Sequence, residues 1–294
     1  MLNFIPRFEV ATLRPPQTRL ISKLGGLPWG FPVGMWPYCR ECTLPMALLA
    51  QLPHQGPEVD FGDSRWVLHI FQCATAGCDT MSYDGGCNAA LMLPREALGE
   101  GLTQAPEPTR ERPIRAWTSG SVPVEHSMHG ELWLTGWQEH DDAVPQHLGP
   151  AYFHVDTFYA LPEELQFPDD YNYQLRTKSG GVPYWTAAAG PTEVPHPFEY
   201  LLQIDTAIPI QGRLPDPSEV GCDVYVHHAS GETEEIRRVP SAAKRENAPW
   251  SVHQLRDEVG DYQVEFANFG SDGTAYVFID RETTPPRAIF FWNR

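Results

Sequence analysis

One short block occurs twice in this chain. It reads Ser22-Lys23-Leu24-Gly25-Gly26-Leu27-Pro28-Trp29 the first time and, 155 residues later, Thr177-Lys178-Ser179-Gly180-Gly181-Val182-Pro183-Tyr184-Trp185. Each glycine pair permits a backbone turn that a β-carbon would forbid, and the proline fixes the exit from that turn. Because two further segments recur in the same order, we predict an internally duplicated unit with a pseudo-twofold relation.

The first of these segments is an apolar strand with a glutamine inside it, at Gln51 and again at Gln203. The second is a turn before another apolar strand, 60–63 leading into 66–71 and 268–273 leading into 276–279. A polar amide within an apolar strand requires a backbone partner. We therefore expect each glutamine to hold the Gly-Gly loop of its own half.

Four cysteines follow the first block with the spacing C-x2-C-x30-C-x4-C, at Cys39, Cys42, Cys73 and Cys78. Two such pairs, brought together by a hairpin, complete a tetrahedral zinc site. The sequence thus predicts a structural zinc ion that staples a loop in the first copy only. Cys87, His54 or His69 could replace one of the four ligands. The cysteines could instead be buried free thiols, a redox pair or disulfides, while Cys222 reads as a core residue.

Composition indicates a mainly β protein, with a β-rich α+β fold as the alternative. The 294 residues include 29 prolines and 24 glycines, which interrupt helices and mark turns. We predict a first repeat over 1–105, an acidic connecting region with strands over 106–170, and a second repeat over 171–294.

Local patterns predict several individual elements. Apolar residues between 4 and 10 indicate an edge strand, and residues 114–117 indicate another strand. Short helices are expected within 88–98 and 251–255, and a hairpin around Gly231.

The formal net charge is −17, from 21 basic and 38 acidic residues. Such a chain would repel nucleic acid, whereas a basic protein partner suits it. Residues 101–170 carry twelve acids and three arginines, so this region is either a solvated face or a landing site for a cationic partner. The candidate partner-binding residues are Trp29, Trp36, Trp185, Glu139, Asp141 and Asp142; the tryptophans could instead cap the core.

Residues 1–16 contain no apolar run typical of a signal peptide, and no 18-residue apolar segment occurs in the chain. We expect a cytoplasmic protein that does not enter membranes. A reducing compartment also favours metal thiolates over disulfides.

Five histidines lie between 126 and 154, interspersed with acids, and suggest a competing metal-dependent hydrolase. They are His126, His129, His140, His147 and His154, with Glu131, Glu139, Asp141 and Asp142 among them. Imidazole and carboxylate groups together bind hydrolytic metals. However, the spacing contains no H-E-x-x-H pair, and the chain has no nucleophile elbow or phosphate-binding loop.

The glycine block, the C-x-x-C pair, the strand from Pro45 to Leu52, the turn Phe61-Gly62-Asp63 and the second glycine block together resemble the YwqG-like family. They also resemble its eukaryotic relatives, the programmed-cell-death-2-like and Tsr-type ribosome-assembly proteins. The resemblance covers about residues 18–95 and 175–292 and marks Gly25, Gly26, Pro28, Trp29, Gln51, Gly180, Gly181, Pro183, Trp185 and Gln203.

This resemblance implies a duplicated architecture without an established enzymatic activity. It implies a chaperone-like role for ribosomal proteins in eukaryotes and a link to toxin immunity in bacteria. Together with the acidic composition, it leads us to expect a non-enzymatic protein-binding module, either an immunity protein or a chaperone of a basic protein.

Overall fold

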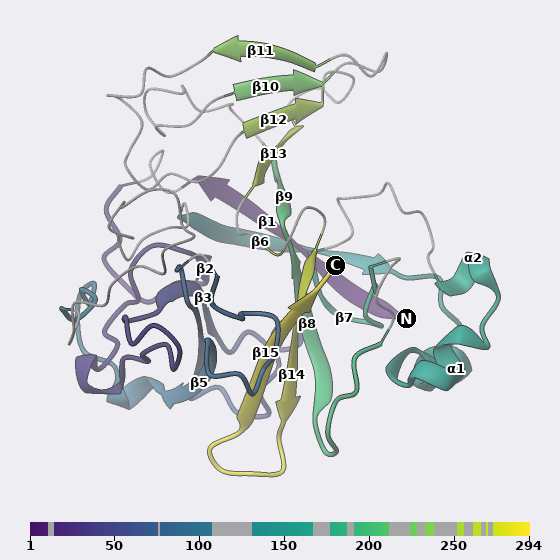
Figure 1. The fold of residues 1–294 in the computed structure, drawn as a ribbon, viewed down its shortest axis with the longest axis horizontal. Helices are drawn as coiled ribbons and strands as arrows, with labels where there is room; N and C mark the ends of the chain where they lie inside the picture. The colour runs from purple at the N-terminus through teal and green to yellow at the C-terminus, as the bar shows by residue number, and fades with distance from the viewer. Residues whose placement is uncertain are drawn as a thin grey trace.

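The computed structural model describes residues 1–10, 15–75, 77–107, 131–166, 177–186, 191–211, 224–227, 233–237, 252–255, 261–265, 269 and 273–294. In this part of the chain the protein is mainly β, as predicted, and its strands form one 15-stranded sheet (Figure 1). The strands are β1 (Leu2–Val10), β2 (Lys23–Leu24), β3 (Ala47–Pro53), β4 (Trp66–Gln72), β5 (Asn88–Pro94), β6 (Leu132–Asp141), β7 (Lys178–Gly180), β8 (Glu199–Asp205), β9 (Ala207–Gln211), β10 (Val224–His227), β11 (Thr233–Arg237), β12 (Val252–Leu255), β13 (Asp261–Glu265), β14 (Thr274–Asp280) and β15 (Arg287–Asn293).

The helical elements are short and lie at the periphery of the strands. They are η2 (Val33–Met35), η3 (Arg95–Ala97), η4 (Gln146–Phe153), α1 (Val155–Tyr159) and α2 (Glu163–Gln166). Figure 1 shows α1 and α2 together at one side of the sheet. None of the helices in the described residues is long and apolar enough to cross a membrane.

Two antiparallel ladders of four strands carry the two glycine blocks. The first ladder runs β2-β3-β4-β5 and the second runs β7-β8-β14-β15. The first joins β6 and the second joins β1, and these two long strands pair with each other from Leu2↔Asp141 to Val10↔Leu132. The ladders therefore share a strand order, although their origin by duplication stays a prediction.

The main hydrophobic core contains side chains from both ladders. Leu68 and Ile70 of β4 meet Ala275 and Val277 of β14 in this core. The alternate residues of the same strands, such as Phe71 and Tyr276, belong to two separate clusters. Because side chains alternate across a strand, β4 and β14 are buried on both faces. This explains why apolar residues occupy most positions of both strands.

The prediction that the first strand lies at an edge of the sheet is wrong. β1 pairs along its length with β6 on one side, and with β7 and β9 on the other. Pro6 is tolerated because pairing with β7 ends at Phe4 and pairing with β9 is at Phe8. The missing N–H of Pro6 thus falls between the two neighbouring strands.

The acidic connecting region contributes β6, which lies between β1 and β2 in the sheet. Hydrogen-bonded strands therefore join the three predicted segments. The hairpin expected around residue 231 is present as β10 and β11, which pair from Val224↔Arg237 to His227↔Thr233. These strands extend the sheet through β12, β13 and β9 and lie at the top of Figure 1.

Two short helices expected from the sequence are strands in the structure. Residues 88–94 form β5, and only Arg95–Ala97 turn as a 3-10 helix, because Pro94 cannot occupy a helix interior. Residues 252–255 form β12 between β10 and β13. Sheet pairing with distant residues overrides weak local helical spacing at both places. The strand predicted over 114–117 lies outside the described residues.

Candidate metal centre and the two glycine blocks

Loops beside β3, β4 and β5 bring the cysteines together. Cys39 and Cys42 lie between η2 and β3, Cys73 follows β4 directly, and Cys87 directly precedes β5. Because Gln72 of β4 is opposite Asn88 of β5, the adjacent Cys73 and Cys87 are also neighbours, and the Cys73 N–H donates to the Cys87 carbonyl at 2.8 Å. The antiparallel pair thus delivers thiols from distant parts of the chain to one place.

The first cysteine pair occupies a tight turn. The Thr43 N–H donates to the Cys39 carbonyl at 2.8 Å, and Thr43 has a left-handed backbone with φ 63°. Such a turn directs both thiols to the same side of the loop. In the other loop, the Thr75 N–H donates to the Cys73 sulfur at 3.4 Å, an interaction that favours the thiolate form.

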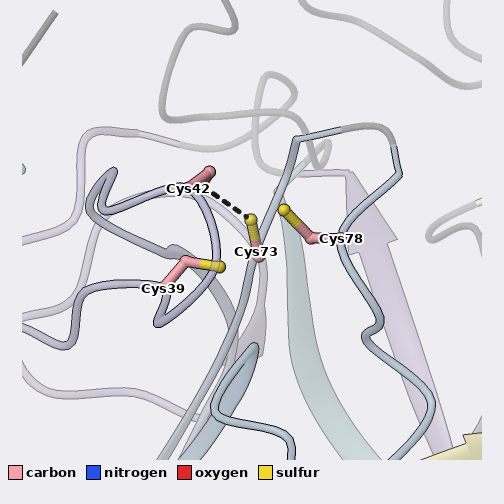
Figure 2. A group of neighbouring side chains, drawn as sticks. All are labelled: Cys39, Cys42, Cys73 and Cys78. Atoms are coloured by element: carbon pink, nitrogen blue, oxygen red, sulfur yellow. Dashed lines mark hydrogen bonds between the residues drawn. The ribbon is translucent and has the colours of Figure 1, made fainter. Parts of the chain in front are cut away.

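The four predicted ligands form a compact group. Their sulfur atoms all lie within 4.8 Å of one another, and Cys42 Sγ is 3.5 Å from Cys73 Sγ. Figure 2 shows Cys39, Cys42, Cys73 and Cys78 converging from the two loops, with the Cys42–Cys73 contact dashed. Metal–sulfur bonds of about 2.3 Å in a tetrahedron place neighbouring sulfurs about 3.8 Å apart. The group fits that geometry and could bind a metal ion.

A fifth thiol borders this group. Cys87 is fully buried, and its sulfur lies 3.4 Å from Cys39 Sγ. It belongs to a second group of possible ligands with Glu41 and Cys78, whose ligand atoms also lie within 4.8 Å of one another. Cys87 is therefore next to the predicted ligand set and outside it.

The two histidines weighed as ligands are engaged elsewhere. His54 Nδ1 accepts the Phe61 N–H at 3.1 Å. His69 lies in β4, fully buried, with its ring 4.9 Å from that of Phe31. Burial lowers the pKa of His69 to about 3. Neither histidine is part of a candidate ligand group in the described residues.

The thiols influence one another's protonation. The hydrogen bond with Cys42 lowers the pKa of Cys39, and the hydrogen bond with Cys39 raises the pKa of Cys73. Burial raises the pKa of Cys78 to about 12 and also raises that of Cys87. A cation must displace protons from most of these thiols, so its binding strengthens as pH rises.

The tryptophans proposed as partner contacts divide into two kinds. Trp36 and Trp185 are 4% and 1% exposed, and their indole N–H groups donate to the carbonyls of Met46 and Tyr152 at 2.9 and 2.8 Å respectively. Their assignment as partner contacts is wrong, because both lie in the core with their polar atom satisfied. Trp29 is half-buried and bridges to Leu102.

The acids proposed as partner contacts also differ in exposure. Glu139 and Asp141 are exposed at the end of β6. The assignment of Asp142 as a partner contact is wrong. Its side chain is only 9% exposed, pairs with Lys178 Nζ at 2.8 Å and accepts the Val182 N–H at 3.0 Å. A carboxylate committed to these internal contacts is not a landing site for a partner.

Both glycine blocks surround a buried lysine–carboxylate pair, which was not predicted from the sequence. Lys23 is fully buried and pairs with Glu131 at 2.8 Å, as Lys178 pairs with Asp142. Burial lowers the pKa of each lysine, and the paired carboxylate opposes this shift. The sequence did contain a signal for these ion pairs, because a lysine stands before Gly-Gly in both blocks.

The glycines are required by these pairs. All four have left-handed backbones, with φ of 65° and 67° in the first block and 72° and 66° in the second. A β-carbon on Gly26 would collide with the Glu131 carboxylate, and one on Gly181 with that of Asp142. Each block therefore wraps around a carboxylate at one end of β6.

The predicted role of the two glutamines is confirmed. Gln51 Oε1 accepts the Trp29 N–H at 2.7 Å, and its amide N–H donates to the Ile21 carbonyl at 2.9 Å. Gln203 Oε1 accepts the Tyr184 N–H at 2.8 Å. Each side chain thus holds the loop that follows its own glycine pair.

The histidine-rich region does not form a metal site in the described residues. His147 and His154 are exposed, and His140 Nδ1 lies 3.4 Å from the Asn3 amide nitrogen. The candidate ligand groups in this part of the chain contain cysteines and Glu41 alone. His126 and His129, like Cys222, lie outside the described residues.

Comparison with known proteins adds no family to this picture. A scan against protein-family models gives no match, and a search of curated proteins gives no match either.

Proposed function

We propose that this chain is a non-enzymatic protein-binding module whose first half is held together by a structural zinc ion. Its partner is a basic protein, either a toxin that the chain neutralises or a client that it chaperones. The observation that carries this proposal is an uncharged loop beside the cysteine group, which presents exposed apolar side chains from a fixed backbone.

Zinc is supported by the donor set. Four thiolates form a soft ligand set that suits zinc, and an all-cysteine tetrahedron has no open position for water or substrate. Cys39, Cys42, Cys73 and Cys78 would hold the ion, which would cross-link the loop before β3 to the loop after β4. In this role the ion stabilises the fold and performs no reaction.

The uncharged loop spans residues 24–39, between Lys23 and Arg40. Three of its side chains are exposed although they are apolar or aromatic: Val33 at 57%, Met35 at 49% and Tyr38 at 38%. Single apolar residues are common on protein surfaces. Three within six residues of one loop make an apolar surface suited to protein contact.

The loop is fixed at both ends by backbone hydrogen bonds. The Gly30 N–H donates to the Gly101 carbonyl and the Gly99 N–H donates to the Gly30 carbonyl, both at 2.7 Å. At the other end, the Cys39 N–H donates to Leu44 and the Met46 N–H to Pro37, both at 2.9 Å. A fixed loop loses little conformational entropy when a partner binds.

Charge supports the proposal of a basic partner. The segment that pairs with the loop exposes Leu102 beside Glu100, with Glu96 and Glu107 also exposed. The chain as a whole carries −17. A partner that presents apolar side chains flanked by lysine or arginine would complement this surface and be steered toward it.

We also propose that the chain belongs to the YwqG-like family and that its two ladders arose by duplication. The matched contacts of the two glycine blocks support this proposal. Lys23 and Lys178 each bind a carboxylate, and Gln51 and Gln203 each bind the loop N–H. A cytoplasmic location accords with reduced thiols that bind metal.

The test is an affinity capture from the native lysate with the wild-type chain and with a Val33→Asp/Met35→Asp variant. A Val155→Asp/Tyr159→Ser variant is the matched control, because it alters exposed apolar residues on α1. We expect one stoichiometric basic protein to be retained by the wild type and the control, and lost from the loop variant at an unchanged melting temperature.

The captured protein then distinguishes the two roles. An immunity protein should abolish the toxicity of its partner, whereas a chaperone should raise the soluble yield of a basic client on co-expression. Equal retention by the loop variant would contradict the binding surface. Capture of no basic protein by the wild type would contradict the proposed function.

A further inference from the structure

The cysteine cluster contains one thiol more than a single tetrahedral ion can use. Cys39, Cys42, Cys73 and Cys78 fill the four positions of such an ion. Cys87 is nevertheless fully buried with its sulfur 3.4 Å from that of Cys39. The fifth thiol is therefore enclosed beside a complete ligand set.

Glu41 and Cys78 complete a second set around Cys87. A Glu41 carboxylate oxygen and the sulfurs of Cys78 and Cys87 all lie within 4.8 Å of one another. Cys78 thus belongs to both sets, and Cys39 lies at their border. These ligands come from the turn before β3, the loop after β4 and the residue before β5, so they converge through tertiary structure.

Backbone hydrogen bonds hold the second set in place. The Arg40 N–H donates to the Gly86 carbonyl at 2.9 Å, which ties the turn containing Glu41 to the residue before Cys87. The Asp79 N–H donates to Glu41 Oε1 at 3.3 Å, which ties the same carboxylate to the residue after Cys78. The three ligands are therefore positioned by one network.

We propose that Glu41, Cys78 and Cys87 bind a second thiophilic divalent cation, such as zinc, and that the Cys78 thiolate bridges it to the first ion. This inference rests on the zinc ion in the proposed function. A thiolate has enough lone pairs to bind two cations. The second cation also offsets the negative charge that another thiolate and a carboxylate would concentrate in a partly buried cluster.

The second ion would fasten the strand after it as well. Cys87 directly precedes β5, whose residue Asn88 donates to the carbonyl of Ser82 at 3.2 Å. A cation at Cys87 would hold the loop 79–87 closed against the start of β5. The first ion alone would link only the turn before β3 and the loop that ends at Cys78.

The test is the metal stoichiometry of the full chain, loaded with Zn²⁺ under reducing conditions and freed of excess metal by gel filtration. Native mass spectrometry and elemental analysis should give two zinc ions per chain for the wild type. Cys87→Ser and Glu41→Gln should each retain one ion, and the exposed Glu100→Gln control should retain two. If Cys87→Ser fails to fold, Glu41→Gln alone tests the second site.

The outcomes distinguish the second cation site from the first zinc site of the proposed function. One ion in the wild type, unchanged in Cys87→Ser and Glu41→Gln, would overturn the second site and leave the first intact. Two ions in the wild type and in both variants would place the second ion elsewhere and also overturn this proposal. No bound zinc in the wild type would overturn both sites.

Discussion

The two glycine blocks have matching backbones and dissimilar surroundings. Register places His69 of β4 opposite Gln51 in the first half and Tyr276 of β14 opposite Gln203 in the second. The Tyr276 hydroxyl donates to the Tyr184 carbonyl at 3.0 Å and accepts the Thr186 N–H at 3.3 Å. His69 instead packs against the Phe31 ring, with ring centroids 4.9 Å apart.

The space beside each block is also filled in a different way. In the second half, Trp185 packs on Tyr276 with ring centroids 4.5 Å apart, and Phe278 stacks on Phe291 at 5.8 Å. In the first half, the aromatic cluster around Phe71 leads directly into the cysteines. The same strand frame is thus covered by an aromatic cluster without cysteines in the second half and by an aromatic cluster joined to the cysteine group in the first.

The largest difference between the halves should appear when metal ligation is removed. Cys39→Ser should lower the free energy of unfolding by an amount on the order of several kcal/mol, because ligation free energy is folding free energy. Trp185→Ala should cost about 3–5 kcal/mol through loss of core packing. Thermal unfolding with and without a chelator separates the two causes.

The chelator should lower the melting temperature of the wild type and of Trp185→Ala by similar amounts, and that of Cys39→Ser by less, because this variant has lost a ligand of the first site. A Cys39→Ser variant that responds to the chelator as strongly as the wild type would show that Cys39 does not hold the stabilising metal.

The buried ion pairs should give the next largest effect. Asp142→Asn leaves the Lys178 ammonium buried without a counter-charge, and we expect a loss of about 3–5 kcal/mol in urea denaturation. Glu131→Gln should cost less, because the Glu131 side chain is 25% exposed and the Lys23 ammonium also donates to Gln17 Oε1 at 2.8 Å.

A double replacement tests whether the unpaired Lys178 charge causes the loss of stability. Lys178→Met with Asp142→Asn should recover part of the loss, since no unpaired charge remains. Equal losses for Asp142→Asn and Glu131→Gln would contradict the assigned difference in burial.

Acid should distinguish the halves through His69 and Tyr276. Burial holds the His69 pKa at about 3, whereas an unfolded histidine has a pKa of about 6.5. Below pH 6.5 the unfolded state binds a proton that the folded state does not, so stability present above pH 6.5 is lost as pH falls. The slope is about 1.4 kcal/mol per pH unit. Burial raises the pKa of Tyr276, which stays neutral throughout.

The check is to compare denaturant midpoints of the wild type and His69→Leu between pH 6.5 and 4. The variant should lose less stability than the wild type over this range, and Tyr276→Phe should show the wild-type slope. Parallel curves for the wild type and His69→Leu would refute the role of His69.

The smallest effect should come from the glutamines that hold the loops. Gln51→Ala leaves the Trp29 N–H without its acceptor, and Gln203→Ala does the same to the Tyr184 N–H. A buried donor that loses its partner costs about 1–3 kcal/mol. Hydrogen exchange at these two amides should quicken in the matching variant only, and faster exchange in both halves would contradict local control.

Much of the frame was predictable because it depends on local signals. The apolar runs around Gln51 and Gln203 became β3 and β8, and the C-x2-C pair with Cys73 and Cys78 became the candidate metal group. Repeated sequence also identified both glycine turns. These features follow from strand patterning, turn chemistry and ligand spacing, which are readable without knowledge of distant contacts.

The missed features depend on contacts between residues far apart in sequence. Lys23 meets Glu131 across 108 residues, and Lys178 meets Asp142 across 36 residues. Trp36 and Trp185 resembled surface contacts because aromatic loop residues serve both core and interface. The sheet pairing that buries them, and that places β1 away from an edge, is not encoded in any one segment.

We infer that a bound metal adds to aromatic packing in the first half, whereas aromatic packing acts without a metal in the second. Hydrogen–deuterium exchange of the zinc-loaded and chelator-treated protein tests it most directly. Chelation should speed exchange in β3, β4 and the loop 30–45, and should leave the β8–β14 pairs protected. Unchanged protection in the first half, or equal loss in both halves, would contradict it.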